Sequence, residues 1–146
     1  MNILRFLIPK SHVACLDDTS SLRNGLEKMR NRGYTAMPVI DKNGIYVGTV
    51  TEGDFLWHIL QSEDRSSRML EKMQVVELIR KGWNPPVRAS ETVAEVFAKL
   101  KDQNFVPVVD DRGVFVGIVT RRAILEHCVI AESKNAPHPL QNFTAI

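Results

Sequence analysis

The sequence predicts an α/β fold in which two copies of one β-α-β-β-α unit pack pseudo-two-fold through their sheets. The first observation is an internal repeat: residues 34–56 read YTAMPVIDKNGIYVGTVTEGDFL, and residues 103–125 read QNFVPVVDDRGVFVGIVTRRAIL. A constant shift of 69 positions, which places Pro38 on Pro107, aligns the two stretches without a gap. Self-similarity of this kind indicates one structural unit used twice. The second observation is size, because a unit of about 50 to 60 residues buries too little apolar surface to be stable alone.

Each copy is expected to begin with a short strand followed by a helix. Leu22, Leu26 and Met29 share one face of a helix, because their spacing matches the helical period. Residues 93–100 repeat that apolar pattern in the second copy. Serine, threonine and aspartate side chains precede both helices and can cap their first backbone N–H groups. The short strands are placed near residues 13–16 and 87–89.

A hairpin and a closing helix complete each copy. Apolar runs at 37–40 and 46–51 flank a turn at Asp41-Lys42-Asn43-Gly44, and the runs at 106–109 and 115–120 repeat the pattern. Asn-Gly favours a hairpin because both residues tolerate positive φ. Apolar residues at helical spacing after each hairpin predict an amphipathic closing helix.

The repeat divides the chain into four segments. Residues 1–60 are expected to form the first copy and residues 74–130 the second. Residues 61–73 are polar and charged and are predicted to be a linker. Residues 131–146, with two prolines and no periodicity, are predicted to be a flexible C-terminal tail.

The composition excludes several classes of protein. Of the 146 residues, 44% are hydrophobic and 25% are charged, which is typical of globular domains. The formal net charge of +2 is too small to favour binding to nucleic acids or membrane surfaces. No apolar run approaches the roughly 20 residues that span a bilayer, and two cysteines are too few for a disulfide framework. We therefore expect a cytoplasmic protein without a nucleic-acid or membrane partner.

Candidate ligand-binding residues lie where the second strand of the hairpin meets the closing helix. Thr51 ends the strand in the first copy and Asp54 lies in the first turn of the helix, so a helix N-terminus faces a potential ligand. The hydroxyl can bond a phosphate or ribose oxygen, and the carboxylate can accept both hydroxyls of a ribose diol. The same two residues also make an ordinary helix cap, and the residues alone leave both interpretations open.

The second copy has different chemistry at this place. Thr120 is kept, but Ala123 stands where the first copy has Asp54, and Arg121 and Arg122 begin the helix. A ribose-binding acid is therefore missing, while arginine at a helix start suits phosphate oxygens. The alternative is a solvated pair of surface arginines.

These residues resemble the cystathionine-β-synthase (CBS) domain family, whose domains pair into a Bateman module. Gly48-Thr49-Val50-Thr51-Glu52-Gly53-Asp54 matches the strand-to-helix motif of that family, and the Pro-Val strands at 37–40 and 106–109 match another of its features. The resemblance covers roughly residues 3–129. It implies an adenosine-type ligand in the clefts between the paired domains and a homodimer, with no catalytic domain left over.

A narrower resemblance concerns the ligand. Residues 33–38 (Gly-Tyr-Thr-Ala-Met-Pro) and 120–122 (Thr-Arg-Arg) are similar to segments of small stand-alone CBS proteins that bind cyclic di-AMP. By that resemblance Thr35 and the backbone around it hold an adenine, and the arginines hold phosphates. Asp54 equally suits the ribose of AMP, ADP or ATP, so linear and cyclic ligands stay open. The nucleotide-binding residues that the resemblance implies are Lys10, His12, Val13, Tyr34, Thr35, Ala36, Met37, Pro38, Thr51, Asp54, Thr120, Arg121 and Arg122.

We therefore expect a non-catalytic regulatory module that senses AMP, ADP, ATP or cyclic di-AMP and modulates an unidentified partner protein. Neither a metal site nor a catalytic cofactor is expected, because the sequence offers no motif that pairs a nucleophile with a base and no cluster with metal-ligand spacing. The alternative is a protein-interaction or dimerisation module whose nucleotide pocket is vestigial.

Overall fold

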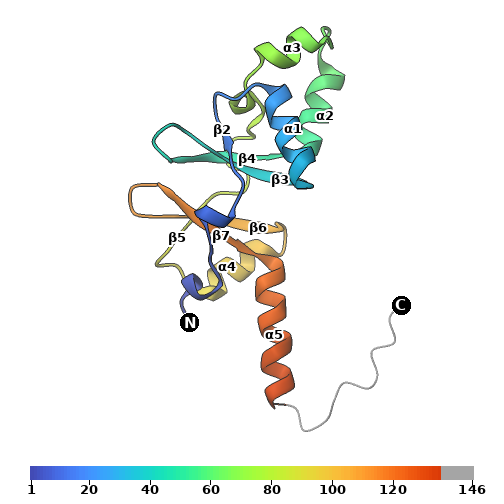
Figure 1. Cartoon of the computed structure of the whole chain (residues 1–146). Coiled ribbons are helices and arrows are strands. Elements are labelled where there is room, and N and C mark those ends of the chain that lie inside the picture. Colours follow the sequence, from blue (N-terminus) through green and yellow to red (C-terminus); the bar gives the residue numbers. More distant parts are fainter. Residues whose placement is uncertain (136–146) are drawn as a thin grey trace, which may run out of the picture.

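The computed structural model describes residues 1–135 and confirms the predicted α/β architecture. Two β-α-β-β-α units face each other through their sheets, and their helices lie on the outer sides (Figure 1). The first unit comprises β2 (Leu16–Asp17), α1 (Leu22–Arg32), β3 (Ala36–Ile40), β4 (Tyr46–Thr51) and α2 (Glu52–Gln61). The second comprises β5 (Val87–Arg88), α4 (Val93–Leu100), β6 (Phe105–Val109), β7 (Phe115–Thr120) and α5 (Arg121–Asn135).

The two sheets have the same topology within each unit. The short leading strand runs parallel to the middle strand, as β2 does to β3, and the middle strand runs antiparallel to the last one. The helix between the two parallel strands supplies the crossover that a parallel pair requires. Ser21 and Thr92 cap α1 and α4 through their hydroxyls, as the sequence predicts.

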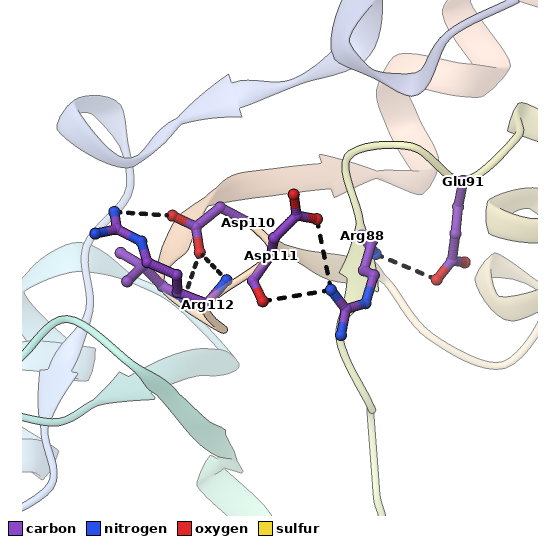
Figure 2. A network of polar contacts seen from close by, with 6 residues as sticks. Arg88, Glu91, Asp110, Asp111 and Arg112 are labelled. Carbon is purple, nitrogen blue, oxygen red and sulfur yellow. Dashed lines mark hydrogen bonds and ion pairs between the residues drawn. The ribbon is translucent and has the colours of Figure 1, made fainter.

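The hairpin turns are built around an aspartate and a glycine. Asp41 accepts hydrogen bonds from the N–H groups of Asn43 (2.8 Å) and Ile45 (3.0 Å). Asp110 does the same in the second unit, where its carboxylate also contacts the Arg112 side chain (Figure 2). The hairpin was predicted from two residues that tolerate positive φ, but only Gly44 adopts it, at 79°. The turn therefore depends on the aspartate and one left-handed glycine.

The leading segment of each unit packs on the other unit. Ile3, in a 3-10 helix at Ile3–Phe6, is buried in the core of the second unit, and β1 (Ile8–Pro9) pairs with β7. In return Val75, in the 3-10 helix Val75–Leu78, is buried in the core of the first unit. The sheets consequently have the orders β2-β3-β4 and β1-β7-β6-β5. Residues 1–9 thus belong to the second core, although the sequence pattern assigned them to the first copy.

Two further segments differ from the prediction. The linker contains a helix, α3 (Ser67–Lys72), whose Met69 is buried in the first core. Helix α5 continues to Asn135 and projects beyond the sheets (Figure 1), so residues 131–135 are helical rather than part of a flexible tail. The rest of that predicted tail, residues 136–146, lies outside the described residues. Within residues 1–135, each helix is too short or too polar to cross a membrane.

Candidate functional site

Two clefts lie between the facing sheets, one on each side of the pseudo-two-fold. The first cleft has a volume of about 320 Å³, and the second has a volume of about 290 Å³. Their walls use corresponding positions of the two copies: Ala36 and Phe105 line both. The first cleft is lined by Ile8, His12, Val13, Ala14, Tyr34, Ala36, Pro38, Asn104, Phe105, Ile118 and Thr120. The second is lined by Thr35, Ala36, Thr51, Glu52, Trp83, Asn84, Asp102, Gln103, Asn104 and Phe105.

Strand β3 separates cleft residues from core residues by alternation. Ala36 and Pro38 face the first cleft, while Met37 and Val39 are fully buried in the first core. This follows from the two-residue period of a strand, since successive side chains point to opposite faces. The Met37 side chain, one of the expected binding residues, therefore lies on the face of β3 away from the cleft.

Tyr34 and Thr35 lead into β3 and serve different clefts. The Tyr34 side chain lines the first cleft and is 43% exposed, and its N–H donates to the Met29 carbonyl at 3.1 Å. Thr35 lines the second cleft, where its carbonyl accepts the Glu52 N–H at 2.9 Å. A ring at the mouth of an apolar cleft is placed to stack on a planar ligand.

Thr120 brings the start of helix α5 to the first cleft. Its hydroxyl accepts the Ala123 N–H at 3.1 Å, and the Arg121 N–H donates to the Asn104 carbonyl at 2.9 Å. The positive end of a 15-residue helix therefore lies beside the cleft, where it favours an anion. The described residues that line this cleft include no carboxylate.

The two expected phosphate-binding arginines point elsewhere. The Arg121 guanidinium donates to the carbonyls of Leu100 (2.8 Å) and Lys101 (3.2 Å), at the carboxyl end of α4. Arg122 pairs with Glu126 at 2.8 Å, and its side chain is 86% exposed. An exposed ion pair of this kind is weak, so Arg122 is free to reorient, whereas Arg121 is fixed by two carbonyls.

Lys10 and His12, two of the nucleotide-binding residues that the resemblance implies, also separate. His12 lines the first cleft. The Lys10 ammonium lies beside Gly44 in the β3–β4 turn and is not part of the cleft wall.

Asp54 is held by three contacts near the second cleft. Its Oδ2 accepts the Thr51 N–H at 2.8 Å, while its own N–H donates to the Thr51 hydroxyl at 3.2 Å. Its Oδ1 lies 3.0 Å from Nε of Arg80, and its side chain is only 10% exposed. The capping interpretation is therefore realised in the structure, together with an ion pair that the sequence did not indicate.

A buried polar network supports the second cleft. Asn84 donates from Nδ2 to the Thr49 hydroxyl at 3.2 Å, and the Tyr46 hydroxyl donates to the Asn84 carbonyl at 2.8 Å. Because the Tyr46 proton is used there, the Thr49 hydroxyl donates to the Tyr46 oxygen over 2.7 Å. Burial raises the pKa of Tyr46 to about 12, and the Thr49 hydrogen bond opposes that rise.

Tyr46→Phe is expected to lower the free energy of unfolding by about 1 to 2 kcal/mol, because the Asn84 carbonyl loses its donor. A pKa raised in the folded state means that the phenol favours folding below pH 10 and loses this contribution as the pH rises through about 12. Urea unfolding at pH 7 and at pH 11 measures both effects. The variant should show a smaller alkaline loss than the wild type, and an equal loss in both would contradict the role of Tyr46.

Several cleft residues were missed by sequence reasoning. Asn104 and Phe105 line both clefts and stand one repeat away from Thr35 and Ala36, so the repeat could have indicated them. Trp83 and Asn84 precede β5 and carry no motif of their own. Among residues 1–135, no group of three or more His, Cys, Asp or Glu side chains is placed to hold a metal ion.

Comparison with known proteins places this geometry in a family. The CBS domain family matches residues 7–61 and 75–130. "Cyclic di-AMP receptor B" of Bacillus subtilis (strain 168) is 27% identical over 122 residues, which cover 84% of this chain and 82% of the relative.

Solved structures agree in fold. CbpB in complex with c-di-AMP is 25% identical, with a TM-score of 0.83 over 92% of this chain and 90% of that one. A CBS domain protein from Streptococcus pneumoniae TIGR4 is 30% identical, with a TM-score of 0.81 over 88% of this chain and 86% of that one. Two matched domains, a shared architecture and the paired clefts agree: the chain belongs to the CBS domain family.

Proposed function

We propose that this chain is a non-catalytic regulatory module that binds cyclic di-AMP in the first cleft. The observation that carries the proposal is that Tyr34, Ala36 and Pro38 from the first repeat and Thr120 from the second line the same cleft. A relative named as a cyclic di-AMP receptor and a similar structure solved with c-di-AMP support the same ligand.

The chemistry of the first cleft suits one adenine nucleoside. Apolar walls at Ala36, Pro38 and Ile118 can cover the faces of a base, and Tyr34 at the mouth can stack on a ring. Asn104 and His12 also line this cleft and offer hydrogen-bonding groups to the base edge and the sugar. A volume of about 320 Å³ holds one nucleoside, near the lower end of small-molecule sites. The other half of a dinucleotide therefore extends toward the opening, beside Tyr34.

The structure favours a cyclic over a linear ligand. In a 3′,5′-linked cyclic dinucleotide each 3′ oxygen is esterified, so the ligand presents no free ribose diol. The second repeat, whose Thr120 lines the first cleft, has Ala123 at the position of Asp54, and Asp54 itself is engaged by Arg80. AMP, ADP and ATP each lose the carboxylate contact that would select them.

The proposed output is a change in a partner protein. A ligand in the first cleft contacts both units and stabilises one arrangement of them, which a partner can distinguish. Exposed apolar side chains recur at corresponding positions of α2 (Leu56, Leu60) and α5 (Leu125, Val129). Such faces suit a homodimer, in which a second copy covers them. We place this complex in the cytoplasm.

Isothermal titration calorimetry with cyclic di-AMP, AMP, ADP and ATP tests the proposal. We expect cyclic di-AMP to bind at least about tenfold more tightly than any of the linear nucleotides. Tighter binding of a linear nucleotide would show that this nucleotide, and not cyclic di-AMP, is the ligand. The chain would still be a nucleotide-binding regulatory module. Absence of heat and of a thermal shift at millimolar concentrations of all four would instead favour an interaction module with a vestigial cleft.

Arg122→Ala is expected to weaken cyclic di-AMP binding by roughly tenfold and to reduce its dependence on salt, because the exposed guanidinium can turn from Glu126 to a phosphate. Titrations at low and high salt measure both quantities. Arg112→Ala is the matched control, since Arg112 is 81% exposed and pairs with Asp110 in a hairpin turn away from the cleft wall. Equal affinity in the two variants would remove Arg122 from the site.

A further inference from the structure

Asp54, the residue expected to bind a ribose beside the second cleft, is engaged by other groups of the protein. Both carboxylate oxygens of Asp54 are engaged, Oδ2 by the Thr51 N–H at 2.8 Å and Oδ1 by Arg80 at 3.0 Å. A carboxylate that accepts two hydroxyls of a diol needs an accessible pair of oxygens. With its side chain 10% exposed, Asp54 does not offer such a pair while Arg80 stays in place.

Arg80 also contacts a tryptophan that lines the second cleft. The Arg80 guanidinium lies 3.9 Å from the centroid of the Trp83 ring, and Trp83 lines the second cleft. Guanidinium groups and indole rings attract each other in this geometry, which limits the positions the ring can take. One arginine therefore fixes both Asp54 and Trp83.

The first cleft has a smaller ring at the corresponding place. Leu16 of β2 pairs with Val39, and Val87 of β5 pairs with Val108, so Leu16 and Val87 are equivalent positions. Counting back four residues from each puts His12 on the wall of the first cleft and Trp83 on the wall of the second. The pseudo-symmetric clefts therefore differ by an imidazole and a larger indole at this position.

The two clefts also differ in the charge of the residues that line them. Glu52 and Asp102 line the second cleft, and both are carboxylates. The lining of the first cleft contains none among the described residues. Phosphate groups are therefore repelled from the second cleft more than from the first.

We propose that Arg80 is a latch that keeps the second cleft closed to adenine nucleotides, so that each chain binds one ligand. The proposal rests on the proposed function only in naming the first cleft as the nucleotide site. Opening the latch exposes Asp54 to a ribose diol and lets the Trp83 ring move. The ligand that gains most is one with a free diol and little phosphate, such as AMP.

Titration of AMP into Arg80→Ala tests the latch. We expect AMP to bind this variant at least about tenfold more tightly than the wild type. This gain in affinity should be absent for 3′-deoxy-AMP, which lacks one hydroxyl of the diol. It should also be absent when AMP is titrated into the double variant Arg80→Ala/Asp54→Ala. Arg88→Ala is the matched control, because Arg88 pairs with Asp111 at an exposed site (Figure 2) and contacts neither cleft wall.

Three results would overturn the latch. They are two cyclic di-AMP molecules bound per wild-type chain, no gain in AMP affinity in Arg80→Ala, or a gain that 3′-deoxy-AMP retains. Arg80→Met removes the charge that pairs with Asp54 but keeps a long side chain beside Trp83, so it should also gain affinity for AMP if Arg80→Ala fails to fold. Cyclic di-AMP affinity in the first cleft should stay within about twofold in both variants. If the wild-type chain fails to bind cyclic di-AMP, the proposed function is wrong. The difference in AMP affinity between Arg80→Ala and the wild type still tests the proposed role of Arg80.

Discussion

Val13→Trp is expected to lower the affinity for cyclic di-AMP by at least about 100-fold, because the indole fills space in the first cleft that the base requires. Val13 lines this cleft and is only partly buried, so the larger side chain can be accommodated without disrupting either core. Isothermal titration calorimetry of the folded variant measures the loss.

Val13→Thr is the matched control for this prediction. Threonine has nearly the shape of valine, and because Val13 is only partly buried the added hydroxyl can be hydrated, so this variant should retain most of the affinity. Wild-type affinity in Val13→Trp would show that the ligand binds outside the first cleft.

Gly117→Ala is expected to lower the free energy of unfolding by about 3 kcal/mol, because a side chain here collides with backbone rather than with a movable side chain. A Cβ at Gly117 would lie 2.2 Å from the Ile8 carbonyl oxygen and 2.9 Å from Cδ1 of Leu7. Strand β1 must then leave β7, and Ile3, 1% exposed in the second core, loses its anchor. Urea unfolding measures the effect.

Gly53→Ala is the matched control for the glycine. A Cβ at Gly53 would meet its nearest neighbour at 3.6 Å, an ordinary contact, and the residue lies within helix α2. Alanine favours helices, so this variant should be as stable as the wild type or up to about 1 kcal/mol more stable. Gly117→Ala should also weaken nucleotide binding, since Ile8 lines the first cleft. Equal stability of the two variants would refute the claim that β1 holds the second unit.

The elements inside each repeat were predictable because their signals are local. Strands β4 (Tyr46–Thr51) and β7 (Phe115–Thr120) have the predicted bounds, since apolar runs bounded by an Asp-to-Gly turn specify them. The helix caps at Ser21 and Thr92 were equally visible, because the capping side chain is adjacent to the helix it caps.

The exchange of leading segments was not predictable from these signals. Ile3 and Ile8 are apolar, which indicates burial but not which of two similar sheets receives them. That choice depends on contacts more than a hundred residues apart, such as Ile8 with Ile118. The sequence did not predict helix α3 because its residues are mostly polar and Met69 is the one that is buried. A single buried residue does not produce the apolar periodicity by which a helix is recognised.

The candidate site was likewise predictable only in part. His12, Tyr34 and Thr120 were expected from the family resemblance and do line the first cleft. The contact between Asp54 and Arg80 joins residues of different repeats, so a motif confined to one repeat gives no sign of it. Arg121 was expected at a phosphate, but the nearby carbonyls at the end of α4 satisfy its guanidinium.

A crystal structure of the full chain grown with cyclic di-AMP tests the central claim most directly. We expect an adenine in the first cleft, between Ala36 on β3 and Thr120 at the end of β7, with the Asp54–Arg80 ion pair intact beside an unoccupied second cleft. Ligand density at Asp54 in the second cleft, with the first cleft empty, would contradict it.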